Sequence, residues 1–304
     1  MRKLDPSELF ELDPDRPEMG RPVLVQALDG FIDAGAAKRI AREHLLSTYE
    51  SQVVATFDVD QLLDYRARRP AMLFVEDHWE SYDDPQLAMH LLHDAVGTPF
   101  LLLAGPEPDV QWERFTEAVR MVVDRLGVRL TIGLNAIPMG VPHTRPTGVI
   151  AHGSRKELVA GYEPWVNAVQ VPGTAGHLIE HRLGQAGYDA MGFAVHVPHY
   201  VSQAEYPAAS AALLAEVGKA SGLALPLDAL NEAAATTRSA IDEQVAGAPE
   251  IAEIVQALEN QYDAFVAGRE SGLLLEHADL PSADELGAEL ERFLAEQSQD
   301  PPQG

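Results

Sequence analysis

Short apolar runs alternate with longer amphipathic stretches through the first two thirds of the chain. Runs at 23–28 and 52–58 predict strands, and the stretch from about 34 to 49 predicts a helix between them. A strand, a glycine-containing turn and a helix, in that order, begin an α/β unit. A helix at 112–126 and strands at 128–137, 166–171 and 189–197 continue the same alternation. The pattern therefore predicts an α/β fold.

Other runs indicate that the sheet is mixed, although mostly parallel. Residues 87–93 and 100–103 flank the turn Asp94-Ala-Val-Gly97, which predicts an antiparallel hairpin. Residues 72–75, continuing towards Trp79, predict a further strand, and 148–152 predict a short one.

The last third of the chain has a helical period. Two apolar stripes, from Leu227 to Val245 and from Ile251 to Phe265, are separated by Gly247-Ala-Pro249 and predict a helical hairpin. Such a hairpin could cover the core or offer a surface to an oligomer or another partner. The expected organisation is an extended surface arm at 1–20, an α/β core at 21–222, the hairpin at 223–268, and a C-terminal arm at 269–304. That last arm would hold one amphipathic helix and a disordered end.

Composition narrows the functional classes. The chain has 304 residues, a net charge of −25 and no cysteine, which excludes disulfides, thiolate metal sites and a cysteine nucleophile. Nucleic-acid binding is not expected, because it needs a basic surface, and Arg66-Ala-Arg-Arg69 is the only basic cluster. The sequence has neither a signal peptide nor a membrane segment, which predicts a cytoplasmic protein. The acidity serves solubility or docking onto a basic partner.

Candidate ligand-binding residues gather where strands are expected to end. Val141-Pro-His-Thr-Arg-Pro146, Val171-Pro-Gly173 and Val197-Pro-His-Tyr200 each follow an apolar run, and proline stops a strand because it cannot donate to the ladder. Three parallel strands would end at one edge of the sheet, where open α/β sheets bind ligands. We call this candidate site the strand-end rim, and its proposed residues are Asp29, Gly30, Asp33, Arg68, His143, Arg145, Gly173 and His199.

Each candidate also has a structural interpretation. The turn at 29–35 lacks the glycine pattern of a phosphate loop and is better explained as a tight turn with an aspartate cap. The arginines could bind an anion, or they could pair with the many nearby carboxylates. His177-Leu-Ile-Glu-His181 matches the H-x-x-E-H zinc pattern, but a surface helix end with two solvated histidines is favoured. We therefore expect no metal and no cofactor, and no catalytic triad is evident.

Several of these segments together resemble a known family. They are Gly30-Phe-Ile-Asp-Ala-Gly35, Phe57-Asp-Val-Asp-Gln-Leu-Leu-Asp-Tyr-Arg66, Leu103-Ala-Gly-Pro-Glu-Pro-Asp109 with Trp112, Gly140-Val-Pro-His-Thr-Arg-Pro146 and Val197-Pro-His-Tyr200. The chain from about Pro22 to Phe265 is similar to the proteasome assembly chaperone 2 family in its actinobacterial branch. The resemblance implies a three-layer α/β/α core like that of nucleoside phosphorylases, and homo-oligomers, with trimers favoured.

The resemblance and the residues leave three hypotheses. The first is a non-enzymatic, proteasome-assembly-chaperone-like oligomer that binds protein partners, possibly proteasome subunits. The chain ends Pro302-Gln-Gly304, without the hydrophobic-tyrosine tail that some relatives use. The second is a phosphorylase-like enzyme or small-molecule binder that uses the strand-end rim, with Arg145 holding an anion and a histidine as acid or base. The third is that the rim only shapes an oligomer interface.

Overall fold

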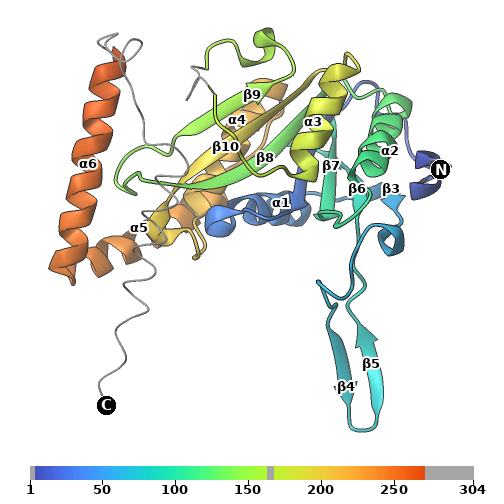
Figure 1. Cartoon of the computed structure of the whole chain (residues 1–304), viewed down its shortest axis with the longest axis horizontal. Coiled ribbons are helices and arrows are strands. Elements are labelled where there is room, and N and C mark those ends of the chain that lie inside the picture. Colours follow the sequence, from blue (N-terminus) through green and yellow to red (C-terminus); the bar gives the residue numbers. More distant parts are fainter. Residues whose placement is uncertain (1–3, 163–167, 271–304) are drawn as a thin grey trace.

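The computed structural model describes residues 4–162 and 168–270, and its centre is an eight-stranded sheet (Figure 1). The strand order is β1-β3-β6-β7-β2-β8-β10-β9. The neighbours β7, β2, β8 and β10 are parallel, and the remaining pairs are antiparallel, which confirms a mixed α/β sheet. The bounds are Phe10–Leu12 (β1), Val23–Asp29 (β2), Gln52–Phe57 (β3), Ala88–His93 (β6), Pro99–Pro106 (β7), Leu130–Met139 (β8), Val149–Gly153 (β9) and Ala190–Pro198 (β10).

Helices cover both faces of this sheet. One core contains α1 (Ala37–Thr48), α4 (Pro207–Ser221) and alternate β2 residues such as Val23 and Val25. The other contains α2 (Trp112–Arg125), α3 (Ala175–Gln185) and the intervening Leu24 and Leu28. A strand buried on both faces becomes apolar at successive positions, which explains the run at the start of β2. The three-layer α/β/α arrangement is confirmed, as is the β6–β7 hairpin.

The strand predicted at 72–75 is present, but it does not join the large sheet, and the chain turns at 76–77 instead of continuing as one strand towards Trp79. β4 (Met72–Val75) pairs with β5 (His78–Tyr82) as a separate two-stranded hairpin, which projects away from the body of the molecule (Figure 1). We call this hairpin and its flanking residues, 70–85, the arm. An apolar run has the same signature in a sheet and in an isolated hairpin, so periodicity alone did not distinguish them.

Two further expectations are also corrected. Residues 168–171 form no strand, and 166–167 lie outside the described residues, so Gly173 does not follow a strand. The N-terminal segment is not an extended surface arm throughout, because β1 pairs with β3 and both Leu9 and Phe10 are buried.

The predicted helical hairpin is present as α5 (Asp228–Ala246) and α6 (Pro249–Glu270). α6 stands at one end of the molecule, beyond the edge of the sheet (Figure 1). The amphipathic helix expected within the C-terminal segment lies outside the described residues. Within the described ranges, no helix combines the length and apolarity needed to cross a membrane.

Candidate functional site

Two of the three expected strand ends do meet at one edge of the sheet. β8 and β10 are parallel and remain in register to their last residues, where Pro198 lies opposite Met139. This brings the segments that carry His143, Arg145 and His199 to the same edge. Burial lowers the pKa of His199.

His143 is almost fully buried and joins the core to α5. Its ring Nδ1 lies 2.6 Å from the Tyr200 hydroxyl, and its Nε2 lies 3.0 Å from Oδ1 of Asp242. The His143 backbone N–H donates to the same Tyr200 oxygen, so the hydroxyl proton is directed to Nδ1 and Nε2–H donates to Asp242. Burial raises the pKa of Tyr200 to about 12, so this donor keeps its proton at neutral pH.

Arg145 is held by α6. Its Nε and Nη2 each donate to one oxygen of Asp263 at 2.8 Å, and its Nη1 donates to Glu259 at 3.2 Å. The Thr144 hydroxyl also donates to Glu259. The two-point bond to Asp263 raises the pKa of Arg145 and lowers that of Asp263. Arg145 thus pairs with carboxylates, but not with the nearby ones that the sequence analysis considered, because its partners lie more than a hundred residues away along the chain.

A cavity of about 430 Å³ lies where the 143–147 loop meets α4 and α5. Arg238 on α5 adds a second guanidinium there, 3.8 Å from Asp242. The lining is His143, Thr144, Arg145, Pro146, Thr147, Tyr206, Ala208, Ala234, Ala235 and Arg238. The cavity thus combines two cations with a largely apolar wall.

Asp29, Gly30 and Asp33 belong to a second group, at the end of β2. Asp33 accepts hydrogen bonds from the backbone N–H groups of Lys38 (2.7 Å) and Arg39 (2.9 Å), so the predicted aspartate cap is confirmed. Asp29 pairs with Arg42 at 2.5 Å. Gly30 leaves room here, because a Cβ at this position would lie 3.2 Å from Oε2 of Glu107.

Lys38 and Glu107 are the buried charges of this second group. Their exposed fractions are 4% and 5%, and Glu107 accepts a hydrogen bond from the Ala175 backbone N–H at the start of α3. Burial lowers the pKa of Lys38, while the carboxylates of Asp33, Asp29 and Glu107 oppose that change. The group therefore joins the β2 turn, the end of β7 and the α3 N-terminus.

The remaining rim candidates lie elsewhere. Arg68 pairs with Asp109 at 2.8 Å, at the base of the arm. Gly173 precedes α3, where a Cβ would approach the Trp112 ring at 4.0 Å. The eight predicted residues therefore do not form one site.

The H-x-x-E-H segment on α3 has its own contacts. Glu180 pairs with His152 of β9 at 2.9 Å, and the His177 ring packs 5.9 Å from that of His152. Burial and the nearby His152 lower the pKa of His177, whereas His181 is exposed. Across residues 4–162 and 168–270, no group of three or more histidine and acidic side chains is placed to hold a metal ion.

The sequence prediction missed the acceptors Asp242, Glu259 and Asp263 and the buried pair Lys38 and Glu107. Nothing in the sequence distinguishes these three acidic residues among 47. The position of Lys38 could have indicated its burial, because it lies three residues before Ala41, on the apolar face of the predicted helix.

Comparisons with known proteins agree with this geometry. The sequence profile of the PAC2 family matches residues 27–245. A Mycobacterium tuberculosis protein of unknown function is 50% identical, with a TM-score of 0.83 over 90% of this chain and 96% of its own. A Corynebacterium glutamicum protein of unknown function is 40% identical, with a TM-score of 0.81 over 85% and 98%.

A third similar structure carries a functional description. It is a proteasome-assembly chaperone homologue from Mycobacterium tuberculosis, 27% identical, with a TM-score of 0.71 over 77% of this chain and 99% of its own. No curated protein matches the sequence. Because the family profile spans most of the chain, from β2 to α5, this protein belongs to the PAC2 family.

Proposed function

We propose that this protein is a cytoplasmic homo-oligomer, most simply a trimer, of the proteasome-assembly-chaperone type. It works by binding other protein chains, with proteasome subunits as the proposed partners, and performs no catalytic step. Membership of the PAC2 family and the similarity to a proteasome-assembly chaperone homologue support this proposal.

The observation that carries the proposal is the outer surface of the helical hairpin. Only Leu230, Ile241 and Val255 are buried along α5 and the described part of α6. Ile251 and Ile254, which belong to the predicted apolar stripe, remain 44% and 47% exposed. A long helix with uncovered apolar positions is a typical contact surface for a partner.

Charge defines the partner of this surface. Residues 228–268 contain eight aspartates and glutamates but one arginine. Most of these carboxylates are exposed, including Glu250 and Glu253 beside the two isoleucines. The complementary surface is therefore a basic one with an apolar centre.

The strand-end rim has a supporting role in this proposal. His143, Thr144 and Arg145 all bind acidic residues of α5 or α6, so their polar groups fix the position of the hairpin. A rigid hairpin loses less conformational entropy when a partner binds.

Binding to the cognate 20S α-subunits tests the proposal. We expect the pair Ile251→Ser and Ile254→Ser to weaken binding at least about tenfold, as truncation of central contacts does. The pair Glu250→Lys and Glu253→Lys should weaken it as well, and should flatten its dependence on salt. Val96→Ser is the matched control, because Val96 is 76% exposed on the β6–β7 turn. Equal affinity of the wild-type chain, the two double variants and Val96→Ser for the α-subunits would contradict the proposal.

The cavity of about 430 Å³ favours one alternative, the binding of a small anion. Arg145 and Arg238 line it together, and the Arg238 contact with Asp242 is long, at 3.8 Å. Inorganic phosphate is a direct probe. If the alternative is right, calorimetry should show saturable phosphate binding by the wild-type chain and loss of that binding in Arg238→Ala. A wild-type chain that binds no phosphate would exclude phosphate-like anions as ligands of this cavity.

A further inference from the structure

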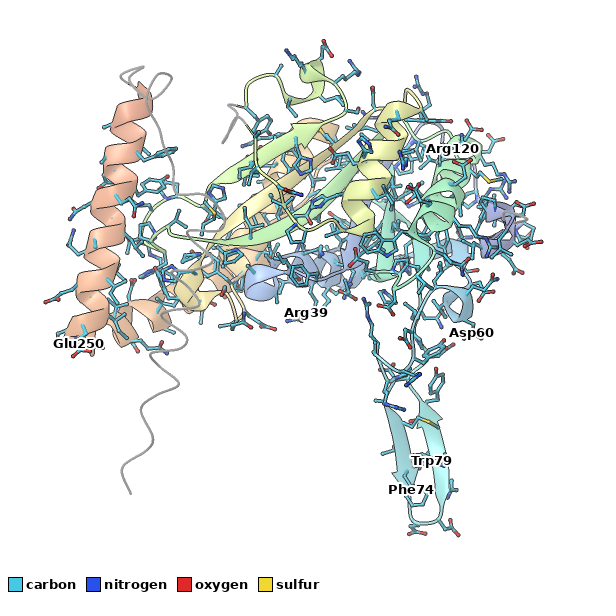
Figure 2. The ribbon with its side chains drawn as sticks, in the orientation of Figure 1. Arg39, Asp60, Phe74, Trp79, Arg120 and Glu250 are labelled. Atoms are coloured by element: carbon cyan, nitrogen blue, oxygen red, sulfur yellow. The ribbon has the colours of Figure 1, made fainter. Side chains whose placement is uncertain are left out.

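Lys38 is a buried amine without a bonded partner. It lies in the first turn of α1, and its exposed fraction is 4%. Among the residues that the structure describes, its side chain forms neither a hydrogen bond nor an ion pair. The next residue, Arg39, instead points outward from α1 (Figure 2) and pairs with Glu43 and Glu205. An unpaired buried lysine is uncommon, because burial of an unpaired charge is costly.

The Lys38 amine and the Glu107 carboxylate border the same point of the structure. A Cβ at Gly30 would lie 3.5 Å from Nζ of Lys38 and 3.2 Å from Oε2 of Glu107. Glu107 uses its other oxygen, Oε1, to accept the Ala175 backbone N–H at the start of α3. Because residue 30 is a glycine, no side chain separates the amine from Oε2.

The neighbouring elements determine how easily Lys38 loses its proton. Burial lowers the pKa of Lys38, and the carboxylates oppose that change. Lys38 in turn helps to lower the pKa of the His177 imidazole. The charged and titratable groups around the amine are Asp29 at the end of β2, Asp33 in the following turn, Arg42 on α1, Glu107 after β7 and His177 on α3. A lowered pKa favours the neutral amine, which is the nucleophilic form of lysine.

The turn between β2 and α1 is lightly packed and strained. Phe31 is 71% exposed, and Gly30 has no side chain to anchor the turn. Ala36 adopts a φ of 50°, in the left-handed region that residues other than glycine rarely enter. Strained backbone of this kind concentrates at ligand-binding and catalytic sites. Movement of residues 30–32 would give a small molecule access to the amine.

We propose that Lys38 binds a small uncharged aldehyde or ketone reversibly, as an imine. The carboxylates of Asp29, Asp33 and Glu107 repel an oxo acid, so the ligand carries neither a carboxylate nor a phosphate. This site goes beyond the partner binding proposed above and does not depend on it.

Imine formation needs no reagent besides the ligand. Lys38 gives one ammonium proton to Glu107, and its nitrogen lone pair attacks the carbonyl carbon while the C=O electron pair moves to oxygen. That oxygen takes a second proton from the nitrogen and becomes a hydroxyl. Glu107 then returns its proton to the hydroxyl, which leaves as water while the nitrogen lone pair forms the C=N bond. The cationic imine remains beside the Glu107 carboxylate.

Reductive trapping with propionaldehyde and cyanoborohydride at pH 7 tests this site, because hydride addition converts the imine to a stable secondary amine. The four lysines of the chain are Lys3, Lys38, Lys156 and Lys219, and the exposed Lys156 and Lys219 serve as internal standards in peptide mass spectrometry. We expect Lys38 to be alkylated at least about tenfold faster than either standard. A Lys38 that reacts more slowly than Lys156 is a structural cation only, and this result would overturn the proposal.

Glyoxylate is the matched anionic probe. The ratio of Lys38 to Lys156 labelling should be lower with glyoxylate than with propionaldehyde. An equal or higher ratio would overturn the assignment of an uncharged ligand.

Glu107→Gln separates a reactive site from an amine that is only accessible. Glutamine keeps an acceptor for the Ala175 N–H but cannot carry the proton, so trapping at Lys38 should slow at least about tenfold. If the amine were only accessible, loss of this carboxylate would lower the pKa of Lys38 further and trapping would become faster. A faster reaction would therefore overturn the role of Glu107.

Glu43→Gln is the matched control, because it removes the same charge from an exposed position on α1. Its trapping rate at Lys38 should equal that of the wild-type chain, and circular dichroism should show that both variants are folded. If Glu107→Gln does not fold, the comparison of Lys38 with Lys156 in the wild-type chain still decides the proposal.

Discussion

His196 in β10 is a partly buried histidine whose ionisation opposes folding. Burial lowers the pKa of this histidine to about 4 in the folded chain, whereas an ordinary histidine has a pKa of 6.5. The unfolded chain therefore binds a proton between these values and the folded chain does not, so stability falls as pH decreases from about 6.5 to 4. The shift corresponds to at most about 3 kcal/mol of the free energy of unfolding.

We expect His196→Gln to remove part of this pH dependence. Urea unfolding at pH 7 and pH 4.5 measures it, and the loss of stability between the two should be smaller in the variant. His181→Gln is the matched control, because His181 is exposed on α3. An identical loss in His196→Gln and the wild-type chain would contradict the assignment.

Individual rim residues were predictable as polar groups at a strand end, but their roles were not. Val141-Pro-His-Thr-Arg-Pro146 indicated where β8 stops, because proline ends the ladder. The sequence could not indicate that Arg145 binds Asp263 on α6, since any of the 47 acidic residues could have served.

At the scale of elements, the helical hairpin depends on a few polar contacts to the core. Arg145 is the residue that holds α6 most directly, through Asp263 and Glu259. We expect Arg145→Ala to release α6, which should be measured as faster amide hydrogen exchange in residues 255–266 and little change in the sheet. High salt should have a similar but smaller effect on the wild-type chain, because exposed ion pairs are screened.

Arg238→Ala is the control, since Arg238 pairs within α5 only loosely. Because the proposed role of Arg145 is to hold α6 within its own chain, Arg145→Ala should keep the wild-type subunit number. Dissociation of the oligomer in Arg145→Ala would favour instead a rim that shapes the subunit interface.

The sequence predicted best those elements whose apolar side chains are buried by the same chain, because burial sets the spacing of apolar residues. α2 and the paired strands β6 and β7 are examples. The prediction for the arm was wrong because its apolar side chains are not buried by this chain. In β2 a similar apolar run is buried on both faces of the sheet. The strand prediction that included residues 168–171 was wrong for a related reason, because a short apolar run does not require strand pairing.

At the scale of the molecule, the order of strands and helices predicted an α/β fold, because few topologies fit an alternating pattern, whereas the three-layer arrangement was implied by the family resemblance. The separation of the predicted rim into two groups, with Arg68 and Gly173 outside both, could not be foreseen. It follows from where α5 and α6 pack, and from the turn after β2, where Asp33 accepts hydrogen bonds from the backbone at the start of α1.

Native mass spectrometry of the intact chain with its cognate 20S α-subunits tests the central claim most directly. We expect the chain alone to be a homo-oligomer, most simply a trimer, and the mixture to contain a complex of this oligomer with α-subunits that dissociates as ionic strength rises. A chain that forms no complex at any salt concentration, under conditions in which it remains folded and oligomeric, would contradict the proposed function.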